Sequence, residues 1–245
     1  PRSTPLYSSA ASDVYKRQVY HKYHQGKEAG NDHGLCTVWA KTSDDNGLTW
    51  HSPRLLVDVA KGDMNVQAPA LLRAESGEIF LIALRAHKGG NSSTMCLFVS
   101  RDDGITFTDM PPVWERSKGQ LLQGGASCLL ELVGGRLLLP FHGGIGNQWR
   151  QKNSAGCFFS DDKGKTWERS SIIKLPKRGA MEASVAELTD GSLLMSLRTQ
   201  LGGPYISRSN DRGKTWSTAV FSGLEAVSYT HLRAHETRED LVCRS

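Results

Sequence analysis

The stretch Ser43-Asp-Asp-Asn-Gly-Leu-Thr-Trp50 decides how this chain is organised, because its pattern returns three more times. The shared pattern is Ser-x-Asp-x-Gly-x-Thr followed by an aromatic residue, and the other copies occupy residues 100–107, 160–167 and 209–216. Successive copies start 57, 60 and 49 residues apart. That interval is typical of one four-stranded blade in a β-propeller. The repeat therefore predicts a propeller in which each motif closes one hairpin per blade.

The residues of this motif, called here the Asp box, suit a tight turn. An Asp carboxylate accepts backbone N–H bonds within the loop, Gly supplies a positive φ, and the aromatic ring anchors the loop on the sheet. A calcium-binding loop is the alternative, but no bidentate Glu follows at the required spacing. We therefore expect no metal or cofactor, and we expect the boxes to lie at the rim opposite the functional site with structural carboxylates at Asp45, Asp102, Asp162 and Asp211.

A second repeat supports the same architecture. Three segments read as strand, Gly-containing turn and strand, and their turn glycines are Gly77, Gly135 and Gly191. These glycines are 58 and 56 residues apart, which matches the interval of the Asp boxes. The sequence thus predicts an all-β propeller with about four blades, of which the two at the ends, residues 19–50 and 183–226, are partial.

Composition excludes several classes of protein. The chain has 245 residues, with 38% hydrophobic content and a formal net charge of +5. Because Lys and Arg are scattered, no basic stripe for nucleic acid is expected, and no apolar run is long enough for a membrane helix. Of the five cysteines, Cys36, Cys96 and Cys157 each precede an Asp box, a place that predicts a strand interior. We expect thiols there in preference to disulfides.

The two ends of the chain do not continue these patterns. Residues 1–18 and 227–245 contain SDVYKRQ and VSYTHLRAHET, which resemble peptides translated from sequencing-adaptor DNA. We therefore treat both ends as non-native tails, and residues 19–226 as part of a propeller truncated at both ends. Genuine disordered termini are the alternative.

The Asp boxes and the segment 181–200 (MEASVAELTDGSLLMSLRTQ) resemble the bacterial sialidase (neuraminidase) family with its Asp-box, or BNR, repeats. Asp boxes alone also occur in non-catalytic propellers, so the segment 181–200 is the more informative match. The resemblance covers about residues 19–226 and implies part of a six-bladed propeller from an exo-acting, retaining hydrolase that releases terminal sialic acid. It implies a sialylated glycan as partner, no nucleic acid or membrane partner, and a secreted or periplasmic location.

The resemblance also implies roles for Glu182 and Arg198. A hairpin returns both side chains to the same end of a blade. Arg suits the planar carboxylate that a sialic acid carries, and retaining sialidases use a Tyr nucleophile activated by a Glu. Glu182 is then the catalytic partner of that Tyr, and Arg198 is one arm of an arginine triad. A surface ion pair at a hairpin end is the alternative.

Other candidates are less specific. In the loop 25–34, Asp32 is favoured over Glu28 as the catalytic acid/base, although a solvated polar loop is as reasonable. Arg85 and His142 end hairpins like Arg198 and are expected to line the same funnel, but Arg85 lies one residue further from its turn glycine and could face away. Trp149 could stack on sugar in the Gly-rich segment 142–150 or simply sit in a connection between blades.

Two departures from the family pattern affect the prediction. The family often has an Asp directly before the Pro of the second blade, whereas this chain has Gln67-Ala68-Pro69, which leaves the identity of the sugar open. The resemblance places the first and third triad arginines and the Tyr nucleophile outside residues 19–226. Tyr205 is too close to Arg198 to be that nucleophile, and it reads as a strand residue. The alternatives are a propeller glycosidase acting on another sugar and a non-catalytic binding propeller.

Overall fold

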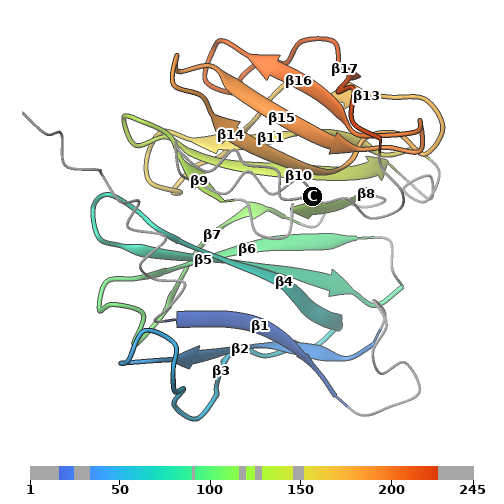
Figure 1. The fold of residues 1–245 in the computed structure, drawn as a ribbon. Helices are drawn as coiled ribbons and strands as arrows, with labels where there is room; N and C mark the ends of the chain where they lie inside the picture. Colours follow the sequence, from blue (N-terminus) through green and yellow to red (C-terminus); the bar gives the residue numbers. More distant parts are fainter. Residues whose placement is uncertain are drawn as a thin grey trace, which may run out of the picture.

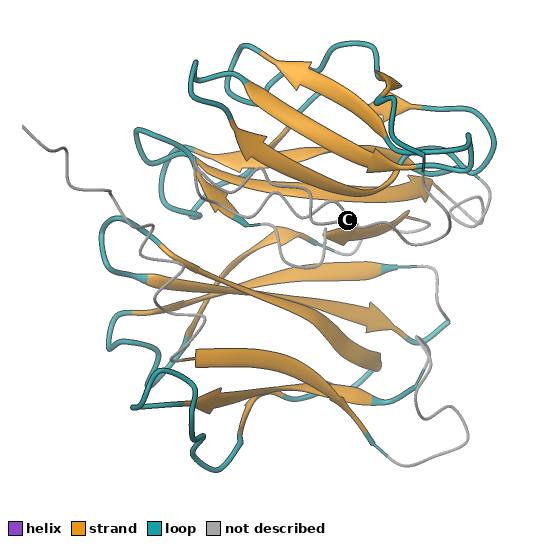
Figure 2. Cartoon of the chain, viewed as in Figure 1, coloured by secondary structure: helices purple, strands orange, loops and turns teal. Residues whose placement is uncertain are grey.

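The computed structural model describes residues 17–24, 34–89, 92–115, 120–124, 129–145 and 152–225. All regular elements in these ranges are β-strands, and they form four sheets that follow one another along the chain (Figure 1, Figure 2). All strand pairs in these sheets are antiparallel. The described residues contain no helix that could cross a membrane. The predicted all-β propeller architecture is thus confirmed.

Each sheet corresponds to one blade. The first blade contains β1 (Arg17–Tyr23), β2 (Cys36–Thr42) and β3 (Arg54–Val57), and the second contains β4 (Asp63–Arg73), β5 (Ile79–His87), β6 (Ser93–Ser100) and β7 (Thr108–Trp114). The third contains β8 (Gln120–Gly124), β9 (Leu130–Glu131), β10 (Leu137–Ile145), β11 (Ser154–Ser160), β12 (Glu168–Arg169) and β13 (Ile173–Lys174). The fourth contains β14 (Met181–Glu187), β15 (Leu193–Arg198), β16 (Tyr205–Ser209) and β17 (Val220–Phe221).

Both end blades differ from the expectation in detail. The fourth blade has four strands in sequential order, so the expectation that it is partial was wrong. The pattern missed its last strand because β17 has only two residues, Val220 and Phe221. The first sheet has three strands among the described residues, and β1 begins at Arg17. Arg17 and Gln18 pair with Thr42 and Lys41, so the strand includes two residues of the segment 1–18.

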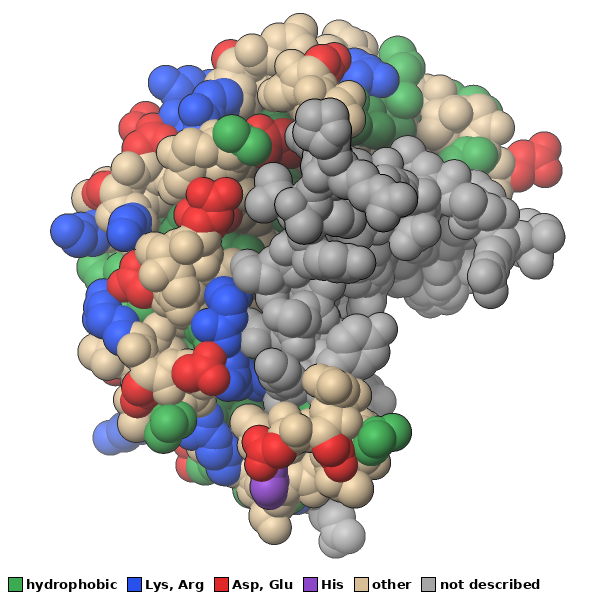
Figure 3. Space-filling model, turned by 60° about the vertical axis from the view of Figure 1, so that its left-hand side comes forward, with side chains coloured by type: hydrophobic (Ala, Val, Ile, Leu, Met, Phe, Trp, Pro, Cys, Tyr) green, Lys and Arg blue, Asp and Glu red, His purple; other side chains and the backbone are tan. Residues whose placement is uncertain are grey.

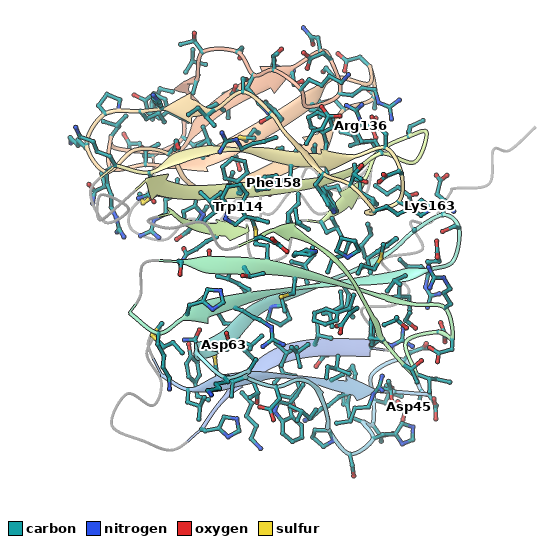
Figure 4. The ribbon with its side chains drawn as sticks, turned by 180° about the vertical axis from the view of Figure 1, so that it is seen from behind. Asp45, Asp63, Trp114, Arg136, Phe158 and Lys163 are labelled. Atoms are coloured by element: carbon teal, nitrogen blue, oxygen red, sulfur yellow. The ribbon has the colours of Figure 1, made fainter. Side chains whose placement is uncertain are left out.

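The core lies between the blades. One buried cluster joins the second and third blades and includes Phe80, Leu97 and Leu139, with Trp114 packed against it. The rings of Trp114 and Phe158 are 5.7 Å apart, as Figure 4 illustrates. A second cluster joins the third and fourth blades, and a third joins the first and second. Successive residues of a strand therefore face different neighbouring blades.

The four Asp boxes share one set of hydrogen bonds. In the third box, Ser160 Oγ donates to Asp162 Oδ1 at 2.8 Å and accepts from Gly164 N at 2.8 Å. Thr166 donates its N–H to Asp162 Oδ1 at 2.9 Å and its Oγ1–H to Oδ2 at 2.6 Å. The corresponding bonds occur in the other three boxes. These bonds are local, which suits a role in closing a turn.

The Asp boxes and the first residues of β4 and β14 occupy opposite ends of the blades. The boxes follow β2, β6, β11 and β16, and those of the second and fourth blades lie at the same end as the turns at Gly77 and Gly191. In Figure 4, Asp45 and Lys163, from two boxes, lie on one side of the molecule and Asp63, at the start of β4, lies on the other. The starts of β4 and β14 and the ends of β5 and β15 therefore share the second end, called here the open rim.

Polar contacts tie neighbouring blades together at the box end. Arg136, which is 6% exposed, donates Nε to Asp161 Oδ1 at 2.7 Å and Nη1 to the carbonyl of Arg212 in the next blade at 2.9 Å. Glu187 of the fourth blade accepts the N–H of Val133 at 3.0 Å. These contacts link the third and fourth blades at the box end.

Candidate functional site

Glu182 and Arg198 meet at the open rim. Arg198 ends β15, opposite Met181 at the start of β14, and Arg198 Nη1 donates to Glu182 Oε1 at 2.5 Å. Both side chains are about one-third exposed, at 32% and 30%. The pair is therefore screened from solvent on one side and accessible on the other. The expectation that the hairpin brings these two residues together is met by this contact.

A bulge in β14 presents Glu182. The register shifts between Met181 and Ser184, and Glu182 has a φ of 45°, a conformation that non-glycine residues rarely adopt. The bulge turns the side chain of Glu182 toward Arg198. In a strand with regular alternation, Glu182 would instead point to the face opposite Met181. Arg198 is the cross-strand partner of Met181 and shares its face, so Glu182 and Arg198 would then point away from each other.

The same bulge occurs in the second blade. The register of β4 shifts between Gln67 and Ala70, and Ala68 has a φ of 51°. Ala68 and Glu182 each lie nine residues before the turn glycine of their blade, Gly77 and Gly191. The two residues are structural equivalents, and at this position the second blade offers a methyl group where the fourth offers a carboxylate.

His142 lies beside the Glu182 and Arg198 pair. It lies on β10 with the alternation of Leu138, whose side chain packs toward the fourth blade. The residue is half-buried, and its Nδ1 atom is buried with no hydrogen-bond partner among the described residues. Burial lowers the pKa of His142 to about 4, the nearby carboxylate of Glu182 raises it, and Arg178 and Arg198 lower it. The imidazole is therefore uncharged at neutral pH.

Arg178 is a member of this group that sequence reasoning missed. It lies in the loop between β13 and β14, four residues before Glu182. Its carbonyl accepts the N–H of Asn153 at 2.8 Å and the Asn153 side-chain amide at 3.2 Å. The one feature of the local sequence that marks this loop is Gly179, which follows Arg178. The structure shows why a glycine is needed there: a Cβ would lie 1.9 Å from the carbonyl oxygen of Asn153.

The structure separates Arg85 from this group. Arg85 Nη1 donates to Asp63 Oδ2 at 2.6 Å and to the carbonyl of Asp58 at 3.0 Å. It has the alternation of Leu81 and Ala83, which face the first blade. The extra residue between Arg85 and its turn glycine puts it on the opposite face of β5 from Leu84, which is the alternative orientation that the sequence left open. A place for Arg85 in the funnel stays a prediction.

The other candidates are placed as follows. Asp32, Glu28 and Trp149 lie outside the described residues. Tyr205 is a strand residue, as expected, and pairs with Leu197 on β15. Cys36, Cys96 and Cys157 lie in β2, β6 and β11 as thiols. Among the residues that the structure describes, no group of three or more His, Cys, Asp or Glu side chains could hold a metal ion.

The site thus combines a carboxylate, two guanidinium groups and an uncharged imidazole. With Glu182 ionised, these four side chains carry a net charge of +1, which favours an anionic ligand. Figure 3 shows Lys and Arg side chains lying among Asp and Glu on the visible described surface. The geometry can bind a carboxylate through Arg and move a proton through Glu182.

Comparison with known proteins finds one matching family and relatives that are sialidases. Residues 24–237 match the BNR repeat-like domain family. A sialidase from Bacteroides fragilis is 27% identical over 207 residues, which are 74% of this chain and 37% of that protein. The chain therefore spans little more than a third of that relative.

Solved structures show the same fold. A Dyadobacter fermentans protein of unknown function has a TM-score of 0.68 at 23% identity, covering 86% of this chain and 66% of the other. The Hadza microbial sialidase Hz136 has a TM-score of 0.65 at 21% identity, covering 82% of this chain and 43% of the other.

Proposed function

The chain belongs to the BNR repeat-like domain family, and from this premise we propose that the full-length protein is an exo-acting, retaining sialidase. Its substrate is a glycan that ends in sialic acid or a related acidic sugar. The similarity to the Bacteroides fragilis sialidase supports this activity.

The observation that carries the proposal is the contact between Glu182 and Arg198 at the open rim. An ordinary surface ion pair needs no backbone strain, yet Glu182 is held at a φ of 45° in a bulge. Strain of this kind costs about 1–3 kcal/mol and persists where the surrounding structure imposes it, often at functional sites. Ala68 has the same bulge in the second blade, so what favours a functional carboxylate is that the fourth blade places Glu182 at this position, in contact with Arg198 and near His142.

In the proposed mechanism, Arg198 binds the carboxylate on the anomeric carbon of the sugar. Glu182 accepts the phenolic proton of a Tyr nucleophile supplied by another part of the full-length protein, and the phenolate oxygen bonds to the anomeric carbon. The bond to the leaving group breaks as its oxygen takes a proton from the acid, for which Asp32 is the candidate. Water then attacks the anomeric carbon, gives its proton to the deprotonated acid, and breaks the bond to Tyr, which recovers its proton from Glu182.

The test is release of product from a fluorogenic sialoside by the full-length protein and its Glu182→Gln variant. The wild type should release product, and the variant should lose mainly kcat, because Glu182 acts in the chemical step. Glu168→Gln, at an exposed carboxylate on β12, is the matched control and should retain activity.

Two outcomes would contradict the proposal. Cleavage of a neutral or uronic sugar without cleavage of a sialoside would indicate a different propeller glycosidase. Tight binding of sialosides with no turnover would indicate a binding propeller.

A further inference from the structure

Four polar side chains meet on the face of the second blade that packs toward the first blade. Asp63 begins β4, Arg85 and His87 lie at the end of β5, and Thr94 lies near the start of β6. The strand register sets Asp63 opposite His87 and Arg85 opposite Thr94. The four are therefore neighbours at the open rim, on the side of the molecule where Figure 4 shows Asp63. They lie two blades away from the site in the fourth blade.

A continuous chain of hydrogen bonds runs through this cluster from a carboxylate to a hydroxyl group. Asp63 Oδ1 lies 3.1 Å from His87 Nδ1, and His87 Nε2 lies 2.9 Å from Thr94 Oγ1. Because an ionised carboxylate only accepts, Nδ1 donates to Asp63, and Nε2 of the neutral imidazole then accepts the hydroxyl proton of Thr94. The order of carboxylate, imidazole and hydroxyl at these distances is that of an orienting acid, a general base and a nucleophile.

The carboxylate end of the chain is held firmly. The side chain of Asp63 is 4% exposed, and its Oδ2 accepts the N–H of Ala60 at 2.8 Å and Nη1 of Arg85 at 2.6 Å. Nη1 of Arg85 also donates to the carbonyl of Asp58 at 3.0 Å. These bonds leave Oδ1 of Asp63 for His87. A buried carboxylate with several donors fixes the tautomer and the orientation of the imidazole that it contacts.

The hydroxyl end of the chain is more accessible. The side chain of Arg85 is 21% exposed and that of His87 is 13% exposed, and Thr94 is half-buried. Arg85 and Thr94 are cross-strand partners on one face, where Cβ atoms lie about 4.5–5.5 Å apart. A guanidinium beside the hydroxyl can donate to an oxygen that gains negative charge during a reaction. The cluster thus offers a nucleophile, a base, an orienting acid and an anion stabiliser.

We propose that Asp63, His87 and Thr94 form a second catalytic site, which hydrolyses a small carboxylic ester with Thr94 as the nucleophile. An ester suits this set of groups because acyl transfer needs an activated hydroxyl, a donor for the oxyanion, and an acid that protonates the leaving alcohol. The inference stands apart from the sialidase proposal, since none of these three side chains takes part in that mechanism.

The reaction proceeds in two steps. Thr94 Oγ1 bonds to the acyl carbon as its proton moves to His87 Nε2, and Arg85 stabilises the negative charge on the carbonyl oxygen. The bond to the leaving alcohol then breaks as the alcohol oxygen takes the proton from His87, which leaves an acyl ester on Thr94. Water bonds to the acyl carbon and gives a proton to His87. The bond to Thr94 Oγ1 breaks, Oγ1 recovers that proton, and the carboxylic acid is released.

The test labels the nucleophile directly. The full-length protein is treated with a fluorophosphonate, which bonds to an activated hydroxyl with loss of fluoride, and the modified residue is located by mass spectrometry. Thr94 should carry the label. Thr94→Val should lose it, because valine keeps the shape and removes the hydroxyl. Thr94→Ser should keep it, because serine retains the nucleophilic oxygen.

The role of the base is tested by the rate of labelling. His87→Gln should be labelled about 100- to 10,000-fold more slowly, the range that a general base contributes. His51→Gln is the matched control, because His51 also contacts a carboxylate, with Nε2 2.7 Å from Asp44 Oδ2, but lies in an Asp box. It should be labelled at the wild-type rate. Hydrolysis of p-nitrophenyl acetate should follow the same order among these variants.

Three outcomes would overturn the proposal: a wild type that is not labelled at Thr94, a His87→Gln variant labelled at the wild-type rate, or ester hydrolysis that persists in Thr94→Val. The hydrogen bonds would then serve only to link β4, β5 and β6. Melting temperatures show whether each variant folds. If Thr94→Val does not fold, the comparison of Thr94→Ser with His87→Gln still decides the question.

Discussion

Ala68 and Glu182 occupy the same position in two blades. Each precedes the turn glycine of its blade by nine residues, and each has a positive φ, 51° and 45°, within a bulge of the first strand. The bulge is thus a property of the repeat, and the residue placed on it differs from blade to blade. In the fourth blade the strained position carries the carboxylate that contacts Arg198.

Because of this strain, we expect the Gly variant at residue 182 to be more stable than the Ala variant, the reverse of the order at an ordinary strand position. Glycine adopts a positive φ without the cost that an L-residue has, about 1–2 kcal/mol. Glu182→Gly should therefore unfold with a free energy about 1 kcal/mol higher than Glu182→Ala, as measured by urea denaturation. At an ordinary strand position Gly would instead be the less stable variant by about 0.5–1 kcal/mol, and that result would show that the bulge is absent.

Arg198→Lys should separate a substrate clamp from a surface ion pair. Lysine keeps the charge but loses the bidentate geometry, so kcat/KM for a sialoside should fall by about 10- to 150-fold in the full-length enzyme. The melting temperature should change little. If Arg198 only forms a surface pair, stability changes by at most about 1 kcal/mol and the kinetics of Arg198→Lys match those of Arg208→Lys.

Gly179→Ala should test the clamp between Asn153 and Arg178. The new Cβ would lie 1.9 Å from the carbonyl oxygen of Asn153, so the loop must move, at a cost of about 2–4 kcal/mol in unfolding free energy. Gly202→Ala is the matched control, because Gly202 has a φ of 97° and open space around its Cβ position. It should cost about 1 kcal/mol. Equal losses in the two variants would mean that the contact with Asn153 does not constrain the loop.

His142 should make stability depend on pH between about 6.5 and 4. Because burial lowers the pKa of His142 to about 4, the unfolded chain binds a proton in this range while the folded protein does not. The free energy of unfolding should fall by up to about 3 kcal/mol as pH drops through this window, and level off below it. His142→Gln should remove this loss in urea titrations at several pH values. His51→Gln, at a histidine that is 61% exposed, should retain it.

The Asp boxes should make the stability of the fold depend on pH in a lower range than His142 does. Hydrogen bonds from Thr166 are the main cause that lowers the pKa of Asp162 to about 2. A lowered carboxyl pKa stabilises the folded state above the unfolded value, about 3.9, and that stability is lost as pH falls toward 2. Asp162→Asn should lower the melting temperature by about 2 °C at pH 7, and the difference should shrink between pH 4 and 2. Asp109→Asn, at an exposed carboxylate on β7 outside any box, is the matched control.

The sequence by itself determined the repeat, the Asp boxes, the hairpins and the placement of Glu182 and Arg198 at the same end of one blade. Each of these depends on residues that are close in the chain. A box closes on bonds between residues two to four positions apart, as from Thr166 to Asp162, and a hairpin of known turn brings its two ends together. Such spacings are visible without a structure.

Only the tertiary structure decided what the neighbouring blades bring to the site. Asn153 holds Arg178 across 25 positions of sequence, and His142 gains its charged neighbours from the next blade. The bulge at Glu182 and the turning of Arg85 toward Asp63 depend on the face that each strand buries against the next sheet. No local pattern encodes these relations, because they arise from packing between sheets and from the strain that the packing sustains.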